Sequence, residues 1–78
     1  MTNKLKAAAM FRVLSMAPMK ESKATFLQYA QDGKVDAFWK FYEGCIRSQP
    51  ERDERIERSG KVSFRMLRPA IEAIYRVK

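Results

Sequence analysis

Residues 36–47 read DAFWKFYEGCIR, and this stretch decides the fold. Its apolar side chains recur at three- and four-residue spacing, which predicts an amphipathic helix. Because it is the most hydrophobic segment, we place it at the centre of the core, with Asp36 as its N-cap. Gly44 within it costs about 1 kcal/mol relative to alanine. That cost suggests either a close approach by a second helix or an end of this helix at Gly44.

Two segments before this stretch are also predicted to be helical. Residues 3–17 and 20–31 both carry apolar side chains at helical spacing. Thr2 or Asn3 can cap the first of these helices, and proline at position 18 prevents its continuation. Gly33 is suited to end the second helix, because glycine accepts the left-handed backbone of a helix C-terminus.

The segments after residue 47 are less hydrophobic. Residues 50–58 begin with a proline suited to a first helical turn, and they form a charged surface helix with one apolar residue. Residues 61–66, KVSFRM, alternate polar and apolar side chains in the manner of a strand. They are either an extended lead-in packed on the core or an edge that pairs with a second copy. From Pro69 onward the pattern predicts a last helix.

These segments predict one all-α domain spanning residues 1–78. The fold class is a small irregular bundle of four to five short helices, with one short extended segment near residues 61–66 as the open alternative. Hydrophobic residues make up 46% of the chain and aromatic residues 12%, which is far more than a disordered chain carries.

The residue inventory argues against catalysis. The chain has no histidine, one cysteine and three isolated glycines, so it lacks the commonest general base, the usual zinc ligand sets and a phosphate-binding loop. We therefore predict no enzyme activity, no cofactor, no metal and no small-molecule substrate. Cys45 reads as a small hydrophobic residue in a reducing, cytoplasmic setting. The acid-free first 20 residues also fit an organelle transit peptide, which is the less favoured alternative.

The charge distribution indicates a polyanionic partner. The formal net charge is +7, and it divides into +4 over residues 1–34, zero over 35–50, −1 over 51–60 and +4 over 61–78. Basic ends attract phosphate-rich surfaces by long-range electrostatics. The sequence therefore predicts a non-enzymatic module that binds DNA or RNA through phosphates. The predicted contact residues are Lys4, Lys6, Arg12, Lys61, Arg65, Arg68, Arg76 and Lys78.

A second hypothesis is a protein-binding adaptor or inhibitor. It would dock on an acidic surface of a larger protein, such as a nucleic-acid-processing enzyme, with Met19, Trp39 and Phe64 as apolar anchors. Trp39 lies off the main apolar stripe, so we expect its ring to be partly exposed. A homodimer formed through residues 62–66 and peripheral attachment to a membrane are further alternatives.

Overall fold

The computed structural model describes residues 1–78 and contains helices without any strand. The helical elements in chain order are α1 (Asn3–Leu14), the 3-10 turn η1 (Lys20–Ser22), α2 (Lys23–Asp32), α3 (Val35–Ser48), α4 (Pro50–Arg58), the 3-10 turn η2 (Arg65–Leu67) and α5 (Arg68–Tyr75). This all-α bundle confirms the fold class predicted from the sequence.

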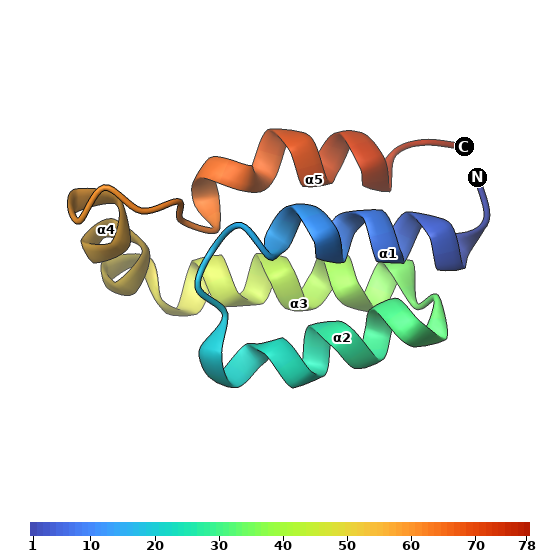
Figure 1. Cartoon of the computed structure of the whole chain (residues 1–78), viewed down its shortest axis with the longest axis horizontal. Helices are drawn as coiled ribbons and strands as arrows, with labels where there is room; N and C mark the ends of the chain where they lie inside the picture. The colour runs from blue at the N-terminus through green and yellow to red at the C-terminus, as the bar shows by residue number, and fades with distance from the viewer.

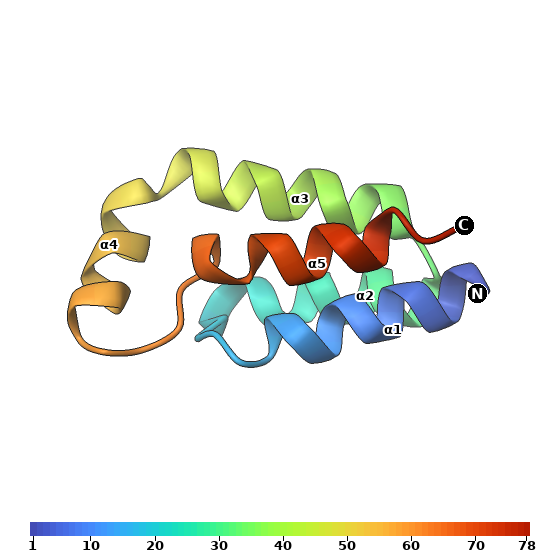
Figure 2. The ribbon, with the colours of Figure 1, turned by 90° about the horizontal axis from the view of Figure 1, so that it is seen from above.

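The four longest stretches of helix, α1, α2, α3 and the η2–α5 segment, run along the long axis of the molecule (Figure 1). The helix α4 stands apart at one end, and both termini lie at the opposite end (Figure 2). The molecule measures 36 × 22 × 18 Å along its principal axes. Surface features at α4 and at the termini are therefore separated by most of the length of the protein.

The core is centred on α3, as predicted. Phe38 and Tyr42 of α3 are fully buried, and the ring of Phe38 lies 4.9 Å from that of Phe26 on α2. The expectation that Trp39 is partly exposed is wrong. Only 7% of Trp39 is exposed, because its indole stacks on the ring of Tyr75 in α5 at 4.9 Å with an interplanar angle of 6°.

The helix ends follow local chemistry in most cases. The Thr2 hydroxyl accepts a hydrogen bond from the Leu5 amide at 3.2 Å, and Gly33 ends α2 with a φ of +66°. Asp36 is not the N-cap of α3, because that helix begins at Val35 and Lys34 occupies the capping position. The Asp36 carboxylate instead accepts a hydrogen bond from the Tyr75 hydroxyl at 2.7 Å.

Neither explanation offered for Gly44 holds. The helix α3 continues through Gly44 to Ser48, and a Cβ placed on Gly44 would meet no atom within 4 Å. Gly44 therefore lies in a helix interior next to open space.

The alternating residues 61–66 do not form a strand. Residues 61–63 have no regular secondary structure, and the chain turns at Phe64 into η2 and α5. Phe64 is 4% exposed, so the segment is a lead-in packed on the core rather than a free edge. Pro69 lies in the first turn of α5, as predicted.

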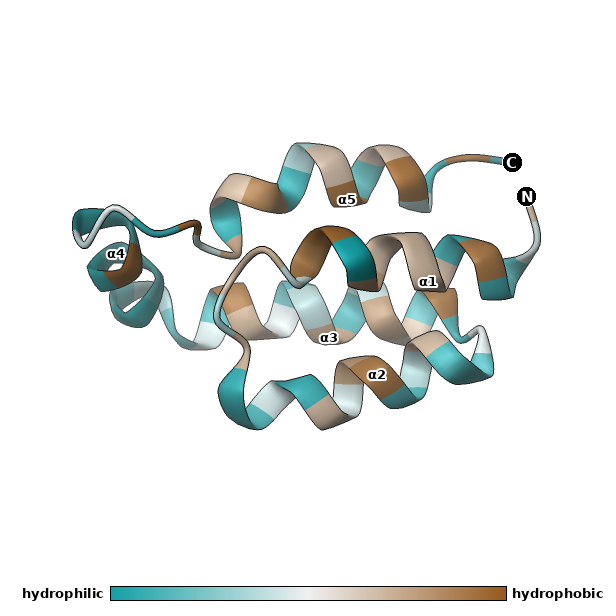
Figure 3. Ribbon diagram, viewed as in Figure 1, coloured by the Kyte–Doolittle hydropathy of each residue, from teal (hydrophilic) through white to brown (hydrophobic).

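Hydrophobic residues are concentrated in the long helices, whereas α4 is almost entirely hydrophilic (Figure 3). None of the helices is both long and apolar enough to span a membrane. The surface helix α4 buries one residue, Asp53.

Candidate nucleic-acid interface

The helix α4 sorts its charges onto different faces. Asp53 and Glu57, four residues apart, hold the segment that follows the helix. Asp53 accepts hydrogen bonds from the backbone amides of Phe64 at 3.0 Å and Arg65 at 2.9 Å. Arg52, Arg55 and Ser59 share a second face, since positions i, i+3 and i+7 of a helix lie in line. Asp53 and Glu57 are therefore occupied within the fold, whereas Arg52 and Arg55 line the surface on the second face.

A basic hollow lies against this second face, with a volume of about 300 Å³. We define the basic hollow by its four cationic residues, Lys20, Arg52, Arg55 and Lys61; Pro18, Ile56 and Ser59 complete its lining. No acidic residue lines it, and none of the four cations forms an ion pair within the protein. Four positive charges that are not neutralised by ion pairs raise the local potential and favour an anionic ligand.

Arg52 is the most constrained of the four cations. Its Nη2 donates a hydrogen bond to the Pro18 carbonyl at 3.1 Å, and its guanidinium lies 5.8 Å from the centre of the Phe64 ring. Arg55 and Lys61 are exposed. The hollow thus combines one fixed guanidinium with side chains that are free to reach a ligand.

Only Lys61 of these four was predicted from the sequence as a phosphate contact. Arg52 and Arg55 were missed because residues 51–60 carry a formal charge of −1 when counted together. Lys20 lies in the basic stretch 1–34 but was not among the predicted contacts. The signal that could have found two of them is the helical spacing of Arg52, Arg55 and Ser59. A charge count along the chain cannot separate two faces of one helix.

Three of the predicted contact residues are held in ion pairs. Arg65 pairs with Glu57 at 2.5 Å, Arg68 with Glu43 at 3.0 Å and Arg76 with Glu72 at 3.3 Å. The guanidinium of Arg68 also lies 5.2 Å from the centre of the Trp39 ring. Each of these arginines therefore has a partner within the fold, which reduces the charge that it offers to a ligand.

The remaining predicted cations lie away from the basic hollow. Lys4 and Lys6 are near the start of α1 and Lys78 ends the chain, so they belong to the end with the two termini (Figure 1). The Lys6 ammonium donates to the Val77 carbonyl at 2.6 Å. Arg12 lines a separate groove between α1 and α2. The predicted contact residues of the first helix and of residues 61–78 therefore lie in several places rather than on one surface.

The proposed anchors of a protein partner lie mostly inside the protein. Met19, Trp39 and Phe64 are 7%, 7% and 4% exposed, and all three belong to the core. Phe64 is held by both of its backbone groups, because its amide bonds Asp53 and its carbonyl accepts a hydrogen bond from the Tyr42 hydroxyl. Burial raises the pKa of this Tyr42 hydroxyl above its ordinary value.

Cys45 is half-buried and lines a second hollow beside the basic one. Burial raises the pKa of its thiol, with the nearby Arg52 charge opposing that shift. No three histidine, cysteine, aspartate or glutamate side chains are grouped as a metal site.

Comparison of this chain with protein-family models, with curated proteins and with solved structures finds no match.

Proposed function

We propose that the protein binds nucleic acid through phosphate groups held in the basic hollow. The observation that supports this most directly is the absence of any acid from a surface lined by Lys20, Arg52, Arg55 and Lys61. Arginine presents planar pairs of donors that match phosphate oxygens, and lysine adds a mobile point charge. Neither contact depends on base sequence, so binding is expected to be largely independent of sequence.

The test is a fluorescence-anisotropy titration of labelled oligonucleotides at about 50 and 200 mM salt. Each phosphate contact on a single strand contributes about −0.7 to the slope of log affinity against log salt, so four contacts give about a 50-fold loss over this range. Arg55→Ala removes one contact and is expected to reduce that loss to about 18-fold. Lys61→Gln is expected to act in the same way.

Lys40→Gln is the matched control, because Lys40 is an exposed lysine on α3 that lines none of the hollows. It changes the net charge as Lys61→Gln does but leaves the basic hollow intact. Equal effects of the two lysine substitutions would mean that only overall charge matters. The absence of binding by the unaltered protein at 50 mM salt would overturn the proposal.

Docking on an acidic protein partner is the second candidate function. The groove between α1 and α2, about 410 Å³ in volume, is lined by Phe11, Leu27 and two alanines together with Arg12. Arg12 has no acidic partner, so an amphipathic helix with leucines on one face and glutamates beside them is the complementary occupant. A synthetic peptide of this pattern should bind the protein and lose affinity on Arg12→Glu but not on Lys61→Gln. Equal binding by both variants would exclude this groove.

A further inference from the structure

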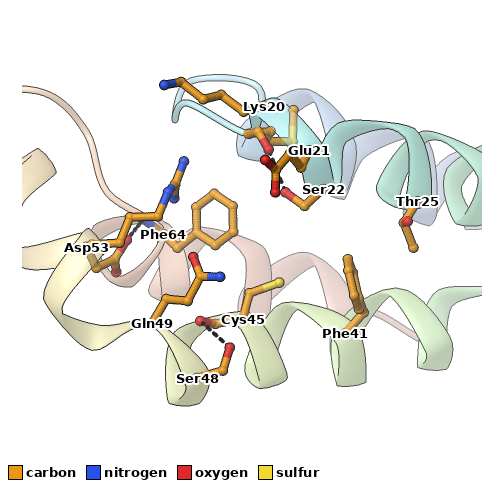
Figure 4. Close-up of a pocket in the computed structure, with 12 residues that line it drawn as sticks. Lys20, Glu21, Ser22, Thr25, Phe41, Cys45, Ser48, Gln49, Asp53 and Phe64 are labelled. Carbon is orange, nitrogen blue, oxygen red and sulfur yellow. Dashed lines mark hydrogen bonds between the residues drawn. The ribbon is translucent and has the colours of Figure 1, made fainter.

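A second hollow adjoins the basic one and shares two of its residues, Lys20 and Arg52. It has a volume of about 460 Å³ and lies between η1, the start of α2, the C-terminal half of α3 and the beginning of α4 (Figure 4). A volume of this size falls within the range of pockets that hold small organic groups. A group attached to a phosphate in the basic hollow would therefore have this hollow beside it.

The lining of this hollow combines aromatic surface and unused polar groups with two acidic residues, Glu21 and Asp53, of which Asp53 is bonded to backbone amides. The ring of Phe41 is partly exposed there, and Phe64 also lines it. The side-chain amide of Gln49 and the hydroxyl of Thr25 line the same hollow, and neither makes a hydrogen bond within the protein. Figure 4 shows Gln49 directed between Phe64 and Cys45. Apolar surface with a few free donors and acceptors suits a flat heteroaromatic ring.

We propose that this hollow, which we name the base pocket, holds one unpaired nucleobase of a single-stranded nucleic acid. The proposal rests on the proposed function, since the phosphates that flank the base would lie in the basic hollow. The base would be held by contact with the Phe41 ring, and its edge would exchange hydrogen bonds with Gln49 and Thr25. Contact with an aromatic side chain is available to every base, so this contact selects single strands rather than a sequence.

Whether its bases are paired decides whether a nucleic acid can place a base in the base pocket. In a duplex the bases are stacked and paired, and bringing one out costs several kcal/mol. A single strand has its bases free, so it can occupy both hollows at once. The inference is therefore a preference for single-stranded over duplex nucleic acid that originates in the base pocket, whereas the phosphate contacts are common to both.

The first experiment compares a short single strand, the duplex of the same length and a strand of abasic sites, all at one salt concentration. The single strand is expected to bind at least about tenfold more tightly than the abasic strand, which is the contribution of one stacked base. Gln49→Ala should weaken binding of the single strand and leave binding of the duplex and the abasic strand unchanged. Gln31→Ala, an exposed glutamine on α2 outside the pocket, is the matched control.

The single cysteine of the chain provides a second readout that needs no substitution. Cys45 lines the base pocket, so a bound base should shield its thiol from a thiol-specific reagent. A saturating single strand is expected to slow the reaction of Cys45 about fivefold or more, whereas the duplex and the abasic strand should leave the rate unchanged.

The outcomes separate the two proposals. Equal affinity for all three ligands, with the salt dependence still reduced by Arg55→Ala, would overturn the base pocket and leave the phosphate proposal standing. An unchanged thiol reaction rate at saturation with the single strand would also overturn the base pocket. The absence of binding by every ligand at low salt would overturn both.

Discussion

Asp53 shows how one side chain joins a surface helix to the core. It is 6% exposed, and its two carboxylate oxygens accept from successive backbone amides at residues 64 and 65. The sequence predicts only a charged surface helix here, because the partners of Asp53 are 11 and 12 residues away and their position depends on the turn at Phe64. The burial of Trp39 was unpredictable for the same reason, because its ring is covered by Tyr75, which lies 36 residues further along the chain.

The first prediction concerns this carboxylate. Asp53→Asn replaces one acceptor oxygen with an NH₂ group that faces a backbone amide, so a buried donor loses its partner. The free energy of unfolding is expected to fall by about 1–3 kcal/mol, which is the cost of an unsatisfied buried polar group. Urea unfolding measures this change. Glu51→Gln on the exposed part of α4 is the control and should alter stability by less than about 0.5 kcal/mol.

At the scale of elements, the helices were predictable because their signals are local. Apolar periodicity, the Thr2 cap, the left-handed Gly33 and the prolines in the first turns of α4 and α5 all act within a few residues. The alternation of residues 61–66 does not correspond to a buried and an exposed face, because Ser63 is buried like the neighbouring Phe64. Its hydroxyl bonds Glu57 at 2.8 Å, so burial here follows a polar contact rather than hydrophobic patterning.

The second prediction compares two glycines. Gly44→Ala should stabilise the protein by up to about 1 kcal/mol, because it improves helix propensity and the new methyl group meets open space. Gly33→Ala should destabilise it by about 1 kcal/mol or more, because φ is +66° and the new Cβ would lie 3.0 Å from the Lys4 Cγ. Thermal unfolding should move in opposite directions for the two variants. A lower midpoint for Gly44→Ala would show that α3 is not open at this position.

The third prediction concerns the link between α4 and the segment after it. The hydrogen bond from Arg65, aided by one from Ser63, lowers the pKa of the Glu57 carboxyl below its ordinary value. The carboxylate therefore stabilises the fold at neutral pH, and this contribution is lost as the pH falls through the lowered pKa. Urea midpoints of the unaltered protein and of Glu57→Gln should differ most near pH 7 and approach each other as the pH falls from the ordinary glutamate pKa of about 4.3 through the lowered pKa of Glu57. A difference that persists unchanged into acid would show that Glu57 acts only through packing.

At the scale of the whole molecule, the fold redistributes the cations of the two basic stretches, because each stretch contributes lysines both to the basic hollow and to the end with the termini. The sequence indicated that Lys/Arg would be concentrated at the ends of the chain, but only folding determines which cations share a surface. The lysine at position 61 joins Lys20, Arg52 and Arg55 beside α4, whereas Lys4 and Lys78 lie at the far end of a molecule that is 36 Å long. The charge total was readable from the sequence, and the grouping of those charges was not.

The last prediction follows from this separation. Electrostatic interactions between exposed charges fall off over a Debye length, which is about 8 Å at 0.15 M salt and about 30 Å at 0.01 M. For an oligonucleotide of about four nucleotides, a common single-strand site size, the double substitution of Lys4→Gln with Lys78→Gln should leave affinity at 0.15 M salt within about twofold of the unaltered protein. Lys61→Gln should weaken it under the same conditions. At 0.01 M salt the double substitution should slow association, because the far charges then act on the approaching ligand. If the double substitution weakened binding as much as Lys61→Gln at 0.15 M salt, the ligand would have to contact the terminal end directly, and the basic hollow beside α4 would not be the binding site.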